Sequence, residues 1–203
     1  MLTPREYLSW SSMDLLERDE KKWIQIYLYG EKNRINRGMA LGRQMAEGLE
    51  NGEMTGDMTL DLVIERLPKF EIMDKPVEAD LKIGKKVIHL LAKPDTMKKN
   101  MTAFKEYKTG QDPWTQAKVD KSGQLEFYNT VFYLKTGKIE RDIELVYVPT
   151  EKQVKGALDA KLGVCGDIQS FKRVVTMTQV LKMCVRMKKA WARIEEICEE
   201  ELL

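Results

Sequence analysis

The hydrophobic pattern changes its period at Pro68, and this change constrains the fold more than any other feature of the chain. Before Pro68, apolar residues recur at helical spacing and predict two helices, one from Ser11 to Gly30 and one over 38–50. After Pro68, short segments rich in apolar and β-branched residues predict strands. These four expected strands cover 69–73, 76–83, 85–95 and 101–110.

The remainder of the chain adds helices and strands in the same way. A helix is expected over 122–134, a strand over 139–149 and a short strand within 167–176. A long helix follows from about Thr178, because its apolar residues are spaced four and three apart along one continuous face. That face consists of Val180, Cys184, Met187, Trp191, Ile194 and Cys198. Two of the three cysteines therefore belong to a core-facing stripe, where cysteine behaves as a small hydrophobic residue.

Length and composition exclude several classes of protein. The 203 residues fit one domain, 1–203, with a full core. No run approaches the roughly 18 apolar residues of a membrane span, and the first residues lack the pattern of a signal peptide. Three cysteines without close pairs favour a reducing cytoplasm and argue against zinc. A single histidine, His89, argues against a histidine-based triad.

Two acids and a lysine lie close together in the segment KPDTMKKNMTAFKEYKTG. Glu106 and Lys108 share one face of an expected strand, and Asp95 ends the strand before it. If these strands pair as a hairpin, Asp95 and Glu106 converge, and two converging carboxylates repel each other unless a cation joins them. Mg²⁺ accepts one or two carboxylates together with water and phosphate oxygens. The alternative is an ordinary amphipathic hairpin with a Glu-x-Lys pair facing water.

The flanking residues make this segment resemble the PD-(D/E)xK nuclease superfamily, in particular its RecB-like exonuclease branch. KPD and EYK supply the motif with ten residues between the two acids, KTG follows directly, and QLEFY supplies the Q-x-x-x-Y pattern. The resemblance covers most of residues 8–150. It implies a restriction-endonuclease-like α/β (α+β) fold, with a mixed central sheet flanked by helices and, in this chain, the long C-terminal helix. It also implies a DNA substrate, Mg²⁺ or Mn²⁺ as cofactor, and four catalytic residues: Asp95, Glu106, Lys108 and Gln124.

The same resemblance assigns roles to further residues. The Tyr107 carbonyl is expected as a third metal ligand, and Glu47 is the nearest acid to a helix histidine that this chain lacks. Glu47 either replaces that histidine or is a solvated helix residue. The four cysteines that hold an iron–sulfur cluster in some members are not all present, so no cluster is expected. The residues expected at the DNA are Tyr128, Trp114, Lys98 and Lys99.

Several alternatives stay open. Tyr128 supports the site, contacts the DNA backbone or is simply an aromatic core residue. Trp114 either stacks on an unpaired base or fills an apolar gap. An exonuclease in recombination, repair or phage DNA metabolism is expected before an endonuclease, and a structure-selective or site-specific endonuclease is the alternative with the same chemistry. The protein would work alone, as a ring-like oligomer or beside a partner recombination protein. The rival hypothesis is a catalytically impaired nuclease fold that binds nucleic acid or protein.

Overall fold

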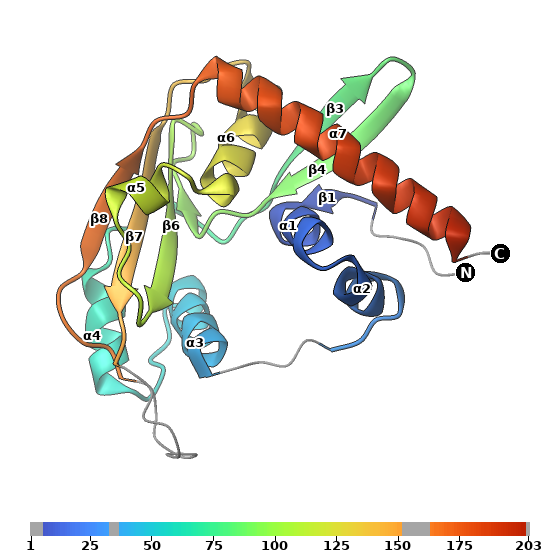
Figure 1. The fold of residues 1–203 in the computed structure, drawn as a ribbon. Coiled ribbons are helices and arrows are strands. Elements are labelled where there is room, and N and C mark those ends of the chain that lie inside the picture. The colour runs from blue at the N-terminus through green and yellow to red at the C-terminus, as the bar shows by residue number, and fades with distance from the viewer. Residues whose placement is uncertain (1–5, 33–36, 152–162, 202–203) are drawn as a thin grey trace.

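The structure is a computed structural model that describes residues 6–32, 37–151 and 163–201. It has an α+β fold in which two mixed β-sheets are flanked by helices, with a long helix at the C-terminal end (Figure 1). The expected α+β class, with its long C-terminal helix, is therefore confirmed. No helix in the described ranges combines the length and apolar character needed to cross a membrane.

The first expected helix is divided into three pieces. They are α1 (Trp10–Arg18), α2 (Glu20–Trp23) and the π-helical turn η1 (Ile24–Leu28). Asp19 causes the first break: its backbone leaves the helical region, with φ −157°, and its side chain accepts a hydrogen bond from the Lys22 N–H. Short polar side chains compete in this way with the helical hydrogen-bonding pattern, so a continuous helix over this segment was a wrong prediction.

The strands belong to two separate sheets rather than to one central sheet. The smaller sheet has the order β1-β4-β3, with β1 (Leu8–Ser9) parallel to β4 (Lys86–Ala92) and β3 (Val77–Ile83) antiparallel to it. The larger sheet has the order β2-β5-β6-β7-β8, in which only β6 and β7 pair in parallel. Its strands are β2 (Ile72–Met73), β5 (Thr96–Met97), β6 (Ala103–Gly110), β7 (Asp142–Pro149) and β8 (Gln169–Arg173).

This division corrects one expectation about pairing. The strand expected over 85–95 ends at Ala92 and pairs with β3, so it does not form a hairpin with β6. The two-residue strand β5 pairs antiparallel with β6 instead, with Thr96 opposite Lys105. Proline at 94 explains the break, because proline has no N–H to donate to a neighbouring strand.

Helices cover the two faces of the β6–β7 pair. On one face, α6 (Gly123–Thr136) contributes to the larger core together with α1 and α7 (Met177–Glu200). On the other face, α3 (Arg37–Asn51) and α4 (Met58–Arg66) form a second, smaller core with Tyr107 and residues of β7. Neither α4 nor the single turn α5 (Gln116–Val119) was expected from the sequence. The site described below lies between these two helical layers.

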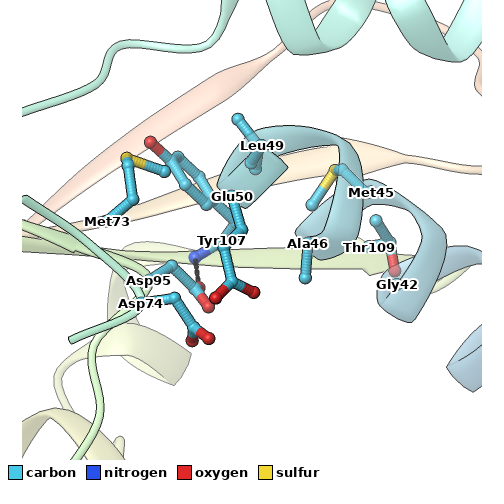
Figure 2. Close-up of a pocket in the computed structure, with 10 residues that line it drawn as sticks. All are labelled: Gly42, Met45, Ala46, Leu49, Glu50, Met73, Asp74, Asp95, Tyr107 and Thr109. Carbon is cyan, nitrogen blue, oxygen red and sulfur yellow. Dashed lines mark hydrogen bonds between the residues drawn. The ribbon is translucent and has the colours of Figure 1, made fainter. Parts of the chain in front are cut away.

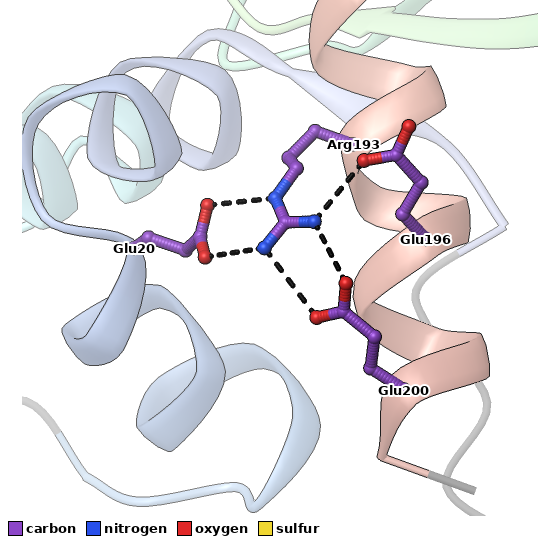
Figure 3. Close-up of polar contacts among 4 residues, drawn as sticks. All are labelled: Glu20, Arg193, Glu196 and Glu200. Carbon is purple, nitrogen blue, oxygen red and sulfur yellow. Dashed lines mark hydrogen bonds and ion pairs between the residues drawn. The ribbon is translucent and has the colours of Figure 1, made fainter.

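The long C-terminal helix confirms its expected stripe. Val180, Met187 and Ile194 are buried, and both cysteines of the stripe pack half-buried against the larger core. A capping box at Thr176 begins α7. Ion pairs join the helix to the N-terminal segment, and Arg193 binds Glu20 of α2 through both Nε and Nη2 (Figure 3).

Candidate active site

Strand β6 positions the central residues of the site by simple alternation. Glu106 and Lys108 face α6, where Gln124 contacts Glu106. Tyr107 faces the opposite way, into the core formed with α3 and α4, and its hydroxyl donates to the Pro68 carbonyl at 2.9 Å. The expected distribution of these side chains over two faces is therefore what the structure has.

Asp95 reaches the same strand from the side. It lies immediately before β5, and its Oδ2 accepts a hydrogen bond from the Tyr107 N–H at 2.6 Å. The short pairing of β5 with β6 holds this geometry, because Thr96 and Met97 are locked opposite Lys105 and Phe104. Asp95 is thus fixed next to the backbone that carries Glu106.

Glu106 is the most enclosed acid of the site. Its side chain is 6% exposed. Its Oε1 accepts hydrogen bonds from Lys108 Nζ at 2.7 Å and from Gln124 Nε2 at 2.6 Å. Its Oε2 is buried and has no hydrogen-bond partner among the described residues. A buried carboxylate oxygen without a donor is costly, so this atom is a candidate ligand for a cation or a water molecule.

The electrostatics of the site reflect two acids in a place with little water. Burial, and then the charge of Glu106, raise the pKa of Asp95 to about 8 from its ordinary 3.8. Asp95 therefore holds a proton at neutral pH when no cation is bound. For Lys108, burial would lower the pKa, but the charge and hydrogen bond of Glu106 and the charge of Asp95 outweigh it and raise the pKa. Its ammonium group stays protonated.

These features fit a divalent cation. The proton on Asp95 and the unpartnered Glu106 Oε2 both mark negative charge that the protein alone does not neutralise. In the described ranges, no three His, Cys, Asp or Glu side chains lie close enough together to hold a metal ion by themselves. A bound ion would thus rely on two carboxylates, completed by the Tyr107 carbonyl and water. Mg²⁺ is commonly bound with this few protein ligands.

The structure does not bring Glu47 to these residues. Its side chain is 56% exposed and forms an ion pair with Arg43, one helical turn away, at 2.8 Å. It lines a separate polar hollow next to the segment that follows α3. The acid that α3 presents to the site is Glu50 instead.

Glu50 lines a small pocket of about 60 Å³ beside Asp95. In Figure 2, the carboxylates of Glu50, Asp74 and Asp95 point toward the same region of this pocket. The remaining lining residues come from α3, β2 and β6. They are Gly42, Met45, Ala46, Leu49, Met73, Tyr107 and Thr109.

No sequence signal separates Glu50 from Glu47, but the packing of α3 on β6 does. A Cβ placed on Gly42 would lie 3.3 Å from Thr109 Oγ1, so Gly42 marks the side of α3 that approaches β6 closely. Residues four and eight positions later share that side, which selects Ala46 and Glu50 and leaves Glu47 facing away.

Asp74 is a second residue that sequence reasoning missed. Its φ of +45° is unusual for a residue with a side chain. Its N–H donates to the Asp95 carbonyl at 3.0 Å, and its carboxylate pairs with Lys93. Nothing in the local sequence predicts this conformation, since it depends on contact with the segment around Asp95.

The residues expected at the DNA have diverse environments. Tyr128 is 8% exposed, and its hydroxyl accepts a hydrogen bond from Gln124 at 3.0 Å, which favours a supporting role. Trp114 is half-buried against the larger core, with Lys118 Nζ 4.8 Å from its ring centroid. Lys99 is exposed, whereas Lys98 lies over the ring of Phe70, 5.4 Å from its centroid.

Comparisons with known proteins give little further information. No protein-family model matches the chain, and no curated protein matches it. The crystal structure of SSO0001 is 11% identical over 93% of this chain and 78% of that chain, with a TM-score of 0.43. The structure of Scheffersomyces stipitis Rai1 in complex with (3'-NADP)+ and calcium ion is 13% identical over 93% and 69%, with a TM-score of 0.28. At these scores, neither likeness bears on the function of this chain.

Proposed function

We propose that the protein is a Mg²⁺- or Mn²⁺-dependent deoxyribonuclease, and an exonuclease rather than an endonuclease. One observation carries the proposal: Asp95, Glu106, Lys108 and Gln124 are neighbours through hydrogen bonds and charge, although 29 positions separate the first from the last. An amphipathic hairpin facing water would not need to bury Glu106 or to bond it to Gln124 of helix α6.

Each residue has a definable task in such a reaction. Gln124 fixes the orientation of Glu106, and the Tyr107 N–H fixes that of Asp95. Lys108, protonated and 31% exposed, presents positive charge beside Glu106, where it would stabilise the negative charge that develops on a phosphate under attack. A protonated lysine cannot accept a proton from water, so the geometry favours this electrostatic role over that of a general base.

A divalent cation, held by Asp95, Glu106 and the Tyr107 carbonyl, would supply Lewis-acid activation of water and phosphate. The protein residues would orient the ligands of the cation and exclude bulk water from the site. DNA is the expected substrate, with Lys99 and other exposed lysines available to the phosphates. Three free thiols, at Cys165, Cys184 and Cys198, support placement in the cytoplasm.

A second candidate function has its own support. The protein could be a catalytically impaired nuclease fold that binds nucleic acid or another protein. The observation that favours it is the scarcity of ligands close enough to share one ion: no three His, Cys, Asp or Glu side chains of the described ranges form such a group, and Glu47 lies apart. A bound cation would then be weak and turnover absent.

A pair of matched variants separates the two functions. Glu106→Gln and Glu47→Gln make the same chemical change inside and outside the site. With Mg²⁺ on linear and circular, single- and double-stranded DNA, we expect Glu106→Gln to lose cleavage by at least a hundredfold and Glu47→Gln to keep it. Absence of cleavage by the unaltered protein on every substrate with either metal would leave only the binding function. Equal activity in both variants would remove Glu106 from the chemistry.

A further inference from the structure

A row of apolar side chains faces solvent at the beginning of α7. It consists of Val174, just before the helix, followed by Met177, Leu181 and Val185. Their exposed fractions are 76%, 39%, 60% and 53%. Met177, Leu181 and Val185 are spaced four residues apart and therefore lie along one side of the helix, and Val174 precedes them in the chain; we name these four residues the α7 outer row.

The outer row is separate from the face that anchors the helix. The inward face of α7 consists of Val180, Met183, Met187, Ala190, Ile194 and Ile197, which are all buried. At 100° per residue, Leu181 and Val185 point roughly opposite to this face. Burial of the inward face already accounts for the docking of α7, and an exposed row of large apolar side chains is a feature of interaction surfaces.

The charged residues of the segment that carries the outer row are all basic, and Glu126 of α6 is an acid whose charge acts on Lys182. No acidic residue occurs from Val174 to Ile194. The two arginines of this span bind carboxylates of the N-terminal helices, Arg186 with Glu17 and Arg193 with Glu20. The exposed lysines beside the outer row form no ion pair with a described residue. They are Lys182, Lys188 and Lys189.

Charge and shape together select one kind of occupant. DNA would satisfy the lysines but would gain nothing from Leu181 and Val185. A second copy packed row against row would place lysines against lysines, and four residues are few beside the roughly 20–30 on each side of a standard interface. A single amphipathic helix needs only three or four anchors in a row. We propose that the α7 outer row binds an acidic amphipathic helix of a partner protein, with its leucine-type side chains on the row and its carboxylates on the lysines.

Synthetic helical peptides test this with the full chain. The acidic probe carries leucines on one face and glutamates beside them. In the basic probe lysine replaces glutamate, and in the polar probe serine replaces leucine. By fluorescence anisotropy, we expect the acidic probe to bind at least tenfold more tightly than either other probe. Leu181→Ser should weaken it at least tenfold, whereas Leu62→Ser, the same change at a 48% exposed position on α4, should leave it unchanged.

Charge reversal adds a second variant that leaves the apolar row intact. Lys189→Glu should weaken the acidic probe and strengthen the basic one, and circular dichroism should show both exposed-site variants folded. Equal binding of the acidic and basic probes would overturn the proposal, as would no binding of the acidic probe. Self-association in light scattering that Leu181→Ser abolishes would assign the row to a second copy, and displacement of the probe by duplex DNA would assign it to nucleic acid.

Discussion

Replacing Asp95 by asparagine should stabilise the metal-free protein at neutral pH. Burial and the charge of Glu106 raise the pKa of Asp95 to about 8 in the folded state, against 3.8 ordinarily. The folded state therefore binds more protons than the unfolded state between these two values. The stability that this bound proton contributes is fully present below pH 3.8 and is lost as the pH rises toward 8. It is lost because the unfolded chain gains free energy by releasing the proton, whereas the folded chain keeps it. Asparagine has no proton to lose, and its amide oxygen can still accept from the Tyr107 N–H.

The size of the effect follows from the width of that window. Each pH unit inside it changes the free energy of unfolding by about 1.4 kcal/mol for one group. Between pH 5 and pH 7, the unaltered protein should lose as much as about 2.5 kcal/mol relative to Asp95→Asn. Groups away from the site titrate equally in both proteins, so the difference between the two curves reports Asp95 together with the neighbours that its charge affects.

Urea unfolding at several pH values, with a chelator present, measures this difference. Asp112→Asn, the same change at an exposed loop position, is the matched control and should follow the unaltered protein at every pH. Parallel stability curves for the unaltered protein and Asp95→Asn would refute the reasoning, because Asp95 would then ionise normally in the folded state. Under the proposed function, saturating Mg²⁺ should flatten the curve of the unaltered protein and leave that of Asp95→Asn unchanged, since a cation replaces the proton.

Three further outcomes are expected. Under the proposed function, Lys108→Arg should keep part of the nuclease turnover that Lys108→Ala loses, because arginine holds a charge but cannot act as a base. Complete loss of turnover in the arginine variant would contradict a purely electrostatic role. Gly123→Ala should lower the free energy of unfolding in urea by about 1–3 kcal/mol, since the added Cβ would lie 2.3 Å from the Trp10 ring. Unchanged stability would show that Trp10 moves aside freely. Arg193→Ala should lower the melting temperature at low salt and less so at high salt, because salt screens its exposed ion pair with Glu20. A salt-independent loss would show that packing, not charge, joins α2 to α7.

The sequence by itself determined the features that depend on local periodicity. Alternation along β6 places Glu106 and Lys108 on one face, and helical spacing places Gln124 and Tyr128 on one side of α6. The core stripe of α7 follows from the same kind of pattern. These relations span only a few residues, so the backbone geometry of one element fixes them before any packing occurs.

Only the tertiary structure decided which elements meet. The strand before Pro94 joins another sheet, so Asp95 is held by two residues of β5, which are too few for any periodic signal. Glu47 and Glu50 are equally plausible helix acids in isolation, and the close approach of Gly42 to Thr109 selects Glu50. Asp74 depends on contacts with Lys93 and the Asp95 backbone. Periodicity states which side chains share a face, but the partner of that face is set by long-range packing of the two cores on β6 and β7.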